Sequence, residues 1–143
     1  VGAKYVIIGH SENRQSGETD KLIKLKIKAA VNAGLKVIFC IGETFSQKRK
    51  KITKQILSKQ IKSGLNKVKK RKNIIIAYEP VWSIGTGVIP KPDELFRTID
   101  FIKKKVKNNK VLYGGSVNPK NIHDLKLINN INGFLVGGFI HNV

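Results

Sequence analysis

Five short apolar runs alternate along the chain with longer segments in which apolar residues recur at helical spacing. Continuous apolar runs of this length are typical of strands covered on both faces, as in a parallel sheet. Each run ends in glycine or a polar residue. The pattern predicts five buried strands, over residues 5–9, 35–41, 74–78, 111–113 and 134–136.

Four amphipathic helices are predicted between these strands. In each of them, apolar residues return every three or four positions and form one stripe. A capping residue or a proline marks each start, and Gly34 closes the first helix. The helices are expected after Thr19 or Asp20, over residues 53–70 and 92–107, and after Pro119.

This alternation is the pattern of right-handed parallel β/α units. A doubly wound sheet and a (β/α)8 barrel both fit it. No GxGxxG or GxxxxGK[ST] motif follows a strand, and two successive late strands end in Gly-Gly, where barrels often build a phosphate site. These features favour an α/β fold of the barrel type, with five parallel strands and four helices in one incomplete domain over residues 1–143.

Composition restricts the functional classes. With 143 residues, of which 41% are apolar and 26% charged, the chain is typical of one soluble globular domain. It has no apolar run of membrane-spanning length and no signal-peptide pattern, so we expect a cytoplasmic protein without a membrane partner. Cys40 is the single cysteine, and the three histidines lack metal-ligand spacing, so we expect no metal.

The net charge of +19 invites a nucleic-acid interpretation. Most of the cations are lysines on the polar sides of predicted helices, and aromatic residues do not alternate with them as a base-stacking surface requires. A solvated basic exterior is the simpler interpretation, without a specific nucleic-acid partner.

Candidate chemistry is concentrated after the third predicted strand. Glu79 ends this strand and Pro80 stops it. Trp82 and Ile84 are apolar residues inside a loop, and the following Gly85-Thr86-Gly87 offers backbone N–H groups unobstructed by side chains. A carboxylate is thus followed at once by a segment suited to close over an anionic ligand. The polar residues 10–14, after the first strand, are expected to form a loop at the same end of the sheet.

Five segments together resemble the triosephosphate isomerase family. They are GHSENR, CIGE, AYEPVWSIGTG, YGGSV and GFLVGG, in the order of that family's fourth to eighth strand ends. The resemblance implies a partial TIM barrel and an intramolecular isomerase that interconverts dihydroxyacetone phosphate and glyceraldehyde 3-phosphate. It further implies a phosphorylated triose substrate, no cofactor and no metal, and a homodimer in the full-length protein.

The resemblance also implies roles for particular residues. Glu79 corresponds to the family's base and His10 to its neutral electrophile, with Ser11 and Glu12 supporting the site. The expected phosphate-binding residues are Gly85, Ser116, Gly137 and Gly138, and the expected lid and clamp residues are Pro80, Val81, Trp82, Ile84, Leu135 and Tyr113.

Some features depart from the family pattern. Asn13, Val88 and Asn132 stand where the family commonly has other residues. The sequence lacks methionine, and we expect that the first three β/α units are absent from it, including a lysine on the first strand, so that these 143 residues alone are inactive. The alternative functions are another phosphate-binding barrel enzyme and a basic polyanion-binding module on a barrel remnant.

Overall fold

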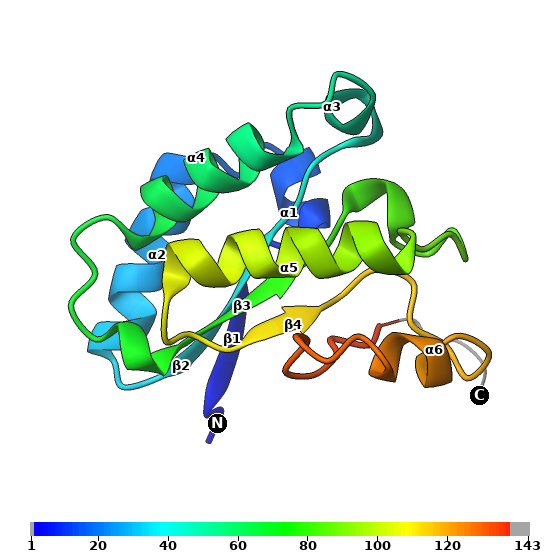
Figure 1. Cartoon of the computed structure of the whole chain (residues 1–143). Helices are drawn as coiled ribbons and strands as arrows, with labels where there is room; N and C mark the ends of the chain where they lie inside the picture. Colours follow the sequence, from blue (N-terminus) through cyan, green and yellow to red (C-terminus); the bar gives the residue numbers. More distant parts are fainter. Residues whose placement is uncertain (1, 138–143) are drawn as a thin grey trace.

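A single parallel sheet organises the chain. The structure is a computed structural model that describes residues 2–137 (Figure 1). The strands pair in sequence order, with Ile8 opposite Phe39 and Cys40 opposite Ala77. This arrangement confirms the predicted α/β class and is consistent with part of a TIM barrel. The strands are β1 (Tyr5–Ile8), β2 (Lys36–Ile41), β3 (Ile74–Tyr78) and β4 (Val111–Tyr113).

The four predicted helices are present. They are α2 (Asp20–Asn32), α4 (Thr53–Leu65), α5 (Pro92–Val106) and α6 (Ile122–Lys126). The Thr19 hydroxyl caps α2 by accepting from the N–H of Leu22. Helix α4 is shorter than expected because Asn66 is extended and Lys67 has a positive φ of 58°.

Two short helices follow strand ends where no helix was predicted. The expected loop over residues 10–14 is wrong in part, because Ser11–Gln15 forms helix α1. Helix α3 (Phe45–Arg49) starts with a reciprocal capping box between Thr44 and Gln47. Five residues are too few to show a helical period, so local capping is the physical cause that the apolar pattern did not reveal. Two 3-10 turns, η1 (Arg71–Asn73) and η2 (Val81–Ser83), complete the elements.

The fifth predicted strand is reduced to a single bridge between Phe134 and Tyr113. The N–H of Leu135 donates to the carbonyl of Tyr113, at 2.9 Å. One residue further, the N–H of Gly114 donates to Tyr78 on β3 instead. The backbone groups of β4 thus alternate between β3 on one side and residues 132–135 on the other, where only the one bridge forms.

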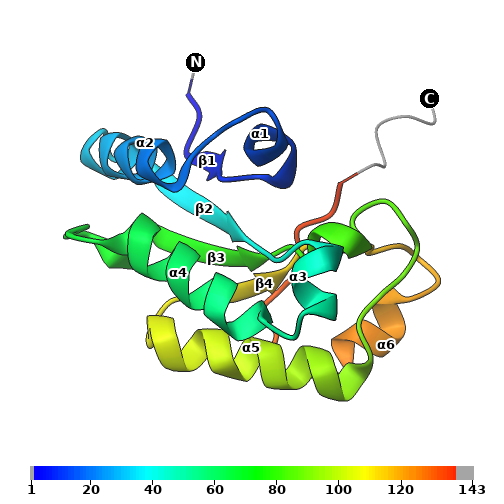
Figure 2. The ribbon, with the colours of Figure 1, turned by 90° about the horizontal axis from the view of Figure 1, so that it is seen from above.

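The core lies between the sheet and the helices on one of its faces. Figure 2 shows α2, α4 and α5 following one another along the sheet, and Ile23, Leu57 and Ile99 from these helices are fully buried. On the opposite face Ile7 is 46% exposed. The helices therefore cover one face, while the other is the face that a barrel turns inward.

Gly64 on α4 lies directly against the ring of Phe39. A Cβ at this position would lie 2.4 Å from the ring, and Phe39 is fully buried. We predict that Gly64→Ala destabilises the protein, because overpacking of about 1–3 kcal/mol exceeds the helix-propensity gain of up to about 1 kcal/mol. Urea unfolding measures the change. Ser63→Ala, on the same helix, is the control, and a more stable Gly64→Ala variant would contradict this packing.

Candidate active site

A cavity of about 540 Å³ lies at the carboxyl ends of β1, β3 and β4. Its lining combines ionisable side chains from β1 and β3 with glycine-rich backbone that follows η2 and β4. Eight of the residues predicted for the site line it: His10, Glu12, Glu79, Ile84, Gly85, Ser116, Leu135 and Gly137. Gly138 lies outside the described residues.

Glu79 is a buried carboxylate at the end of β3. Its residue is 4% exposed, and its Oε2 atom is buried without a hydrogen-bond partner in the structure. Its own N–H donates to the carbonyl of Ile41, at 2.8 Å, which fixes the backbone from which the side chain projects. Burial raises the pKa of Glu79 above its ordinary value, and the nearby His10 opposes that rise. The group is therefore a stronger base than a solvated glutamate.

His10 faces this carboxylate from the end of β1. Its Nε2 lies 3.5 Å from Oε1 of Glu79, and its Nδ1 accepts from the N–H of Glu12, at 3.4 Å. In a neutral imidazole, the ring nitrogen that accepts a hydrogen bond carries no proton, so this contact favours the tautomer with its proton on Nε2. His10 is also the N-cap of α1, so the same contact that starts the helix selects the tautomer.

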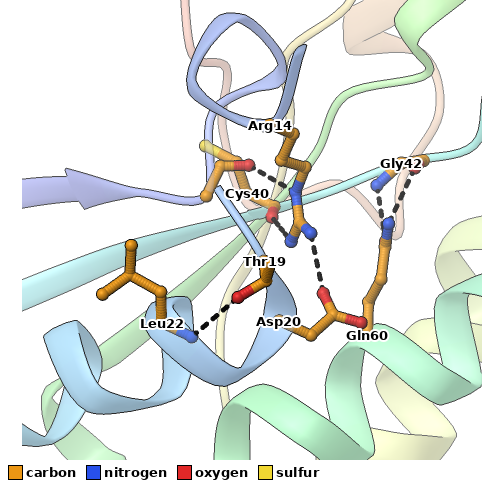
Figure 3. A network of polar contacts seen from close by, with 8 residues as sticks. Arg14, Thr19, Asp20, Leu22, Cys40, Gly42 and Gln60 are labelled. Atoms are coloured by element: carbon orange, nitrogen blue, oxygen red, sulfur yellow. Dashed lines mark hydrogen bonds and ion pairs between the residues drawn. The ribbon is translucent and has the colours of Figure 1, made fainter. Parts of the chain in front are cut away.

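Arg14 fastens the His10 segment to the sheet (Figure 3). Its guanidinium donates to the carbonyl of Gly9 at 2.8 Å, to that of Cys40 at 3.1 Å and to Asp20 at 2.8 Å. One side chain thereby joins the ends of β1 and β2 to the start of α2. Three charge-assisted contacts in one planar group restrict where His10 can lie.

A second polar brace holds the end of β2. The side-chain amide of Gln60 on α4 both donates to and accepts from the backbone of Gly42, at 3.1 and 2.9 Å (Figure 3). Both backbone groups of a buried strand end are thus satisfied by one amide. The brace keeps Gly42 in place beside the backbone of Glu79, to which it lies close.

Glu43, one residue further, contacts the start of the lid, which is the segment from Pro80 to Val88. Its carboxylate accepts from Trp82 Nε1 at 2.9 Å and from the Tyr78 hydroxyl at 3.1 and 3.2 Å. Lys48 Nζ lies 4.3 Å from the centre of the Trp82 ring. Burial raises the pKa of Glu43, whereas the hydrogen bond from Trp82 lowers it. Trp82 therefore supports the lid from outside the cavity and does not line it.

Besides Trp82, four of the predicted residues do not line the cavity. Ser11 is buried in the first turn of α1, and Pro80, Val81 and Tyr113 lie behind the lining. Glu12 is exposed at the cavity edge and has no ion pair among residues 2–137. The N–H of Ser116, an expected phosphate donor, donates to Ser83 Oγ at 3.2 Å.

The described part of the chain contains no group of three or more side chains suited to holding a metal ion. Between residues 2 and 137, no helix combines the length and apolar character needed to cross a membrane. Cys40 is buried beside Glu79, as expected for a small core residue, and burial raises the pKa of its thiol.

Comparison with known proteins assigns the family. The model of the triosephosphate isomerase family matches residues 1–143. The chain belongs to the triosephosphate isomerase family. It is 45% identical to proteins named triosephosphate isomerase from Thermodesulfovibrio yellowstonii and Zygosaccharomyces bailii, and each alignment covers 96% of this chain. A triosephosphate isomerase from Entamoeba histolytica is 44% identical over 94% of it.

The chain spans about 60% of the length of the relatives it matches, 59% for the first and 60% for the second. The resemblance recognised in five short motifs thus extends over the whole sequence given. Triosephosphate isomerase membership confirms the predicted family, whereas the roles of individual residues are inferences from the geometry described above.

Four residues with evident positions in the site were not singled out from the sequence. Arg14, Glu43 and Gln60 brace strand ends, and Ser83 lies under the lid. A carboxylate directly after a buried strand was a usable signal for Glu43, since strand ends carry the chemistry of such sheets. No such signal marks Gln60 and Ser83, whose partners include residues 18 and 30 positions away.

The raised pKa of Glu79 predicts a pH-dependent stability difference. Its folded pKa lies above the unfolded one, so the ionised group destabilises the fold fully above the folded pKa and not at all below the unfolded pKa. Glu79→Gln in the full-length protein should therefore raise the free energy of unfolding at pH 8 more than at pH 4. Urea titrations at both values measure it, with Glu12→Gln as the exposed control. A pH-independent difference would contradict the burial of an ionisable Glu79.

Proposed function

We propose that the full-length protein interconverts dihydroxyacetone phosphate and glyceraldehyde 3-phosphate. The observation that carries the proposal is the pairing of Glu79 with the Nε2 of His10, 3.5 Å apart, in a cavity that glycine-rich backbone and apolar side chains also line. A base and a proton donor that face the same space suit proton transfer next to a carbonyl. Family membership gives this reaction precedence over others that the same pair could perform.

In this reaction Glu79 removes a proton from the carbon that bears the hydroxyl group, next to the carbonyl. As that C–H bond breaks, its electron pair forms the carbon–carbon double bond of an enediolate, and the carbonyl oxygen gains the negative charge. The Nε2–H of His10 stabilises this oxygen by donating to it. His10 then gives its Nε2 proton to this oxygen and recovers a proton from the neighbouring hydroxyl, and Glu79 returns its proton to the former carbonyl carbon, which leaves an aldehyde on the first carbon.

The environment of Glu79 favours its role as base. A carboxylate that accepts few hydrogen bonds and is shielded from water has an elevated pKa, which brings its proton affinity closer to that needed at neutral pH. His10 and Arg14 oppose the rise of the Glu79 pKa, but burial is the largest influence on it.

The phosphate group is proposed to bind at the glycine-rich end of the cavity. Gly85 comes from the lid, Ser116 from the loop after β4 and Gly137 from the segment after Phe134, with Gly138 assigned by resemblance alone. Backbone N–H groups in such concave segments bind anions without side-chain charge. Ile84 and Leu135 also line the cavity and would exclude water from the reacting carbons.

We propose that residues 1–143 form one part of a TIM-barrel domain, corresponding to its fourth to eighth strands. The remainder of the family's length would supply the first three β/α units, including the first-strand lysine, and would cover the exposed Ile7 face. The full-length protein is proposed to be a cytoplasmic homodimer that requires no cofactor.

Substitution of the base tests the proposal. In the full-length protein, Glu79→Gln should lower kcat by at least ~10³-fold, because a positioned base contributes about 10²–10⁴ and Glu79 performs the transfer itself. A coupled assay of glyceraldehyde 3-phosphate turnover measures the change. Glu12→Gln removes a carboxylate from the edge of the same cavity and should have a much smaller effect. A kcat close to that of the unmodified protein would remove Glu79 from this role.

One observation favours a second function, polyanion binding. At the amino-terminal ends of the strands lies a cavity of about 510 Å³ that no described carboxylate lines. Five cations line it: Lys36, Arg71, Lys72, Lys107 and Lys110. It lies at the opposite end of the sheet from Glu79, so occupation of one cavity need not block the other.

We predict that any nucleic-acid binding is weak and independent of sequence, because lysine charges dominate and no stacking surface accompanies them. Affinity should fall steeply between about 50 and 200 mM salt, as expected for counterion release. Fluorescence anisotropy with two DNA duplexes of equal length and unrelated sequence measures it. Selective binding of one duplex that persists at the higher salt concentration would favour the binding-module function.

A further inference from the structure

The cavity of about 510 Å³ at the amino-terminal ends of the strands is lined by cations from three separate segments. Lys36 begins β2, Arg71 and Lys72 belong to η1, and Lys107 and Lys110 lie between α5 and β4. No described aspartate or glutamate lines this cavity. Among residues 2–137, none of the five cations forms an ion pair with a carboxylate. Their positive charge is therefore available to a ligand.

Asn109 joins two walls of this cavity. Its Nδ2 donates to the carbonyl of Arg71 and to that of Ile74, both at 2.7 Å. The loop between α5 and β4 is thereby tied to η1, and these two segments carry four of the five cations. Since an unpaired lysine is not unusual in a chain of net charge +19, this fixed arrangement is what distinguishes the cavity from the rest of the basic surface. Groups that are already in place lose less entropy when they bind a ligand.

Two of the cations are oriented by neutral partners. The Nη2 of Arg71 donates to the carbonyl of Leu65 at 3.0 Å. Because a guanidinium has five N–H donors in one plane, this bond leaves other donors for phosphate oxygens. The Nζ of Lys36 donates to the Tyr5 hydroxyl at 3.4 Å and lies 5.3 Å from the centre of the Tyr5 ring. Both cations are thus held in place without being neutralised by these partners.

The volume and charge of the cavity together indicate the class of its ligand. About 510 Å³ lies within the range of roughly 300–1,000 Å³ that is typical of small-molecule sites. Guanidinium and ammonium groups bind phosphate oxygens through charge-assisted hydrogen bonds, and a chain of linked phosphates can reach more of them than a single phosphate can. Tyr5 is the only aromatic residue in the lining, and Lys36 already lies over its ring, so a nucleoside base finds little stacking surface.

We propose that this cavity binds a small oligophosphate, which is a molecule with two or more linked phosphate groups, through Arg71 and the four lysines of its lining. The inference rests on the polyanion-binding function described above and deepens it, whereas it does not depend on the isomerase function. It assigns one discrete site per chain, where polyanion binding requires only diffuse attraction. Because like charges around one cavity repel one another, a bound oligophosphate should also stabilise the fold.

The test is isothermal titration calorimetry of the full-length protein with inorganic tripolyphosphate at fixed ionic strength. Binding should saturate at one tripolyphosphate per chain and should raise Tm. Arg71→Ala should weaken binding by at least ~10-fold, the scale of losing one charge-assisted hydrogen bond. Lys110→Gln, on the opposite wall, removes only a lysine charge and should weaken binding by about 3-fold.

Two control variants remove the same charges from other places. Arg49→Ala does so on α3, at the other end of the sheet, and Lys62→Gln does so in a neighbouring cavity that Arg71 also lines. Each should change the affinity by less than about 2-fold, because screening by salt limits the reach of an exposed charge. The kcat/KM of Arg71→Ala for glyceraldehyde 3-phosphate should stay within about 2-fold of the unmodified value, which checks that the variant folds.

Comparison of three probes defines what the site recognises. ATP should bind within about 3-fold of tripolyphosphate, because the phosphate chain carries the interaction, and inorganic phosphate should bind at least ~10-fold more weakly because it engages fewer cations. ATP binding more than about 30-fold tighter than that of tripolyphosphate would overturn the inference in favour of a nucleoside site. Equal binding of inorganic phosphate would overturn it in favour of a single-anion site.

The remaining outcomes separate the site from general basic attraction. Tripolyphosphate affinity that is unchanged in both Arg71→Ala and Lys110→Gln, or that falls equally in Arg49→Ala and Lys62→Gln, would overturn the inference. If Arg71→Ala folds poorly, Lys110→Gln decides. Salt-sensitive binding of DNA without saturable binding of tripolyphosphate would overturn the discrete site and leave the polyanion-binding function in place. Absence of both kinds of binding would overturn both.

Discussion

The placement of one ionisable group in a buried strand end is the constraint on which the site depends. Glu79 can be held there because both neighbouring strands support the backbone around it. Its N–H is bound to Ile41 on one side, and the preceding Tyr78 carbonyl accepts from Gly114 on the other. Burial and the lack of a hydrogen-bond partner at Oε2 disfavour the charged form of Glu79. The backbone hydrogen bonds of the sheet hold Glu79 in this unfavourable environment.

His10, the other member of the pair, is positioned by the short helix α1 rather than by a strand. His10 obtains its orientation from a single helical turn that it caps itself, and that turn is fastened to the sheet by Arg14. The rigid strands therefore determine where the carboxylate lies, and a short capped segment determines which imidazole nitrogen meets it. A small displacement of α1 would alter the pair without changing the core.

The apolar pattern predicted the parts of the fold that burial determines. Ile74–Tyr78 and Val111–Tyr113 form strands with the expected bounds, because a strand covered on both faces must be continuously apolar. Short capped helices such as α1 were missed because their stability comes from a few hydrogen bonds. Motifs indicated Glu79 and His10, whereas the partners of Ser83 lie up to 33 positions away and have no periodic signature.

The lid depends both on the buried strands and on individual side-chain hydrogen bonds. At its start, Trp82 is bound to Glu43 beyond the end of β2, and Ser83 is bound to Tyr113 at the end of β4. Trp82 and Ser83 are thus hydrogen-bonded to residues at the ends of β2 and β4, the strands on either side of β3, which carries Glu79. Because all three strands belong to one sheet, a distortion of the sheet would displace the lid and the base together. The geometry of the cavity therefore depends on the sheet as well as on the loop sequence.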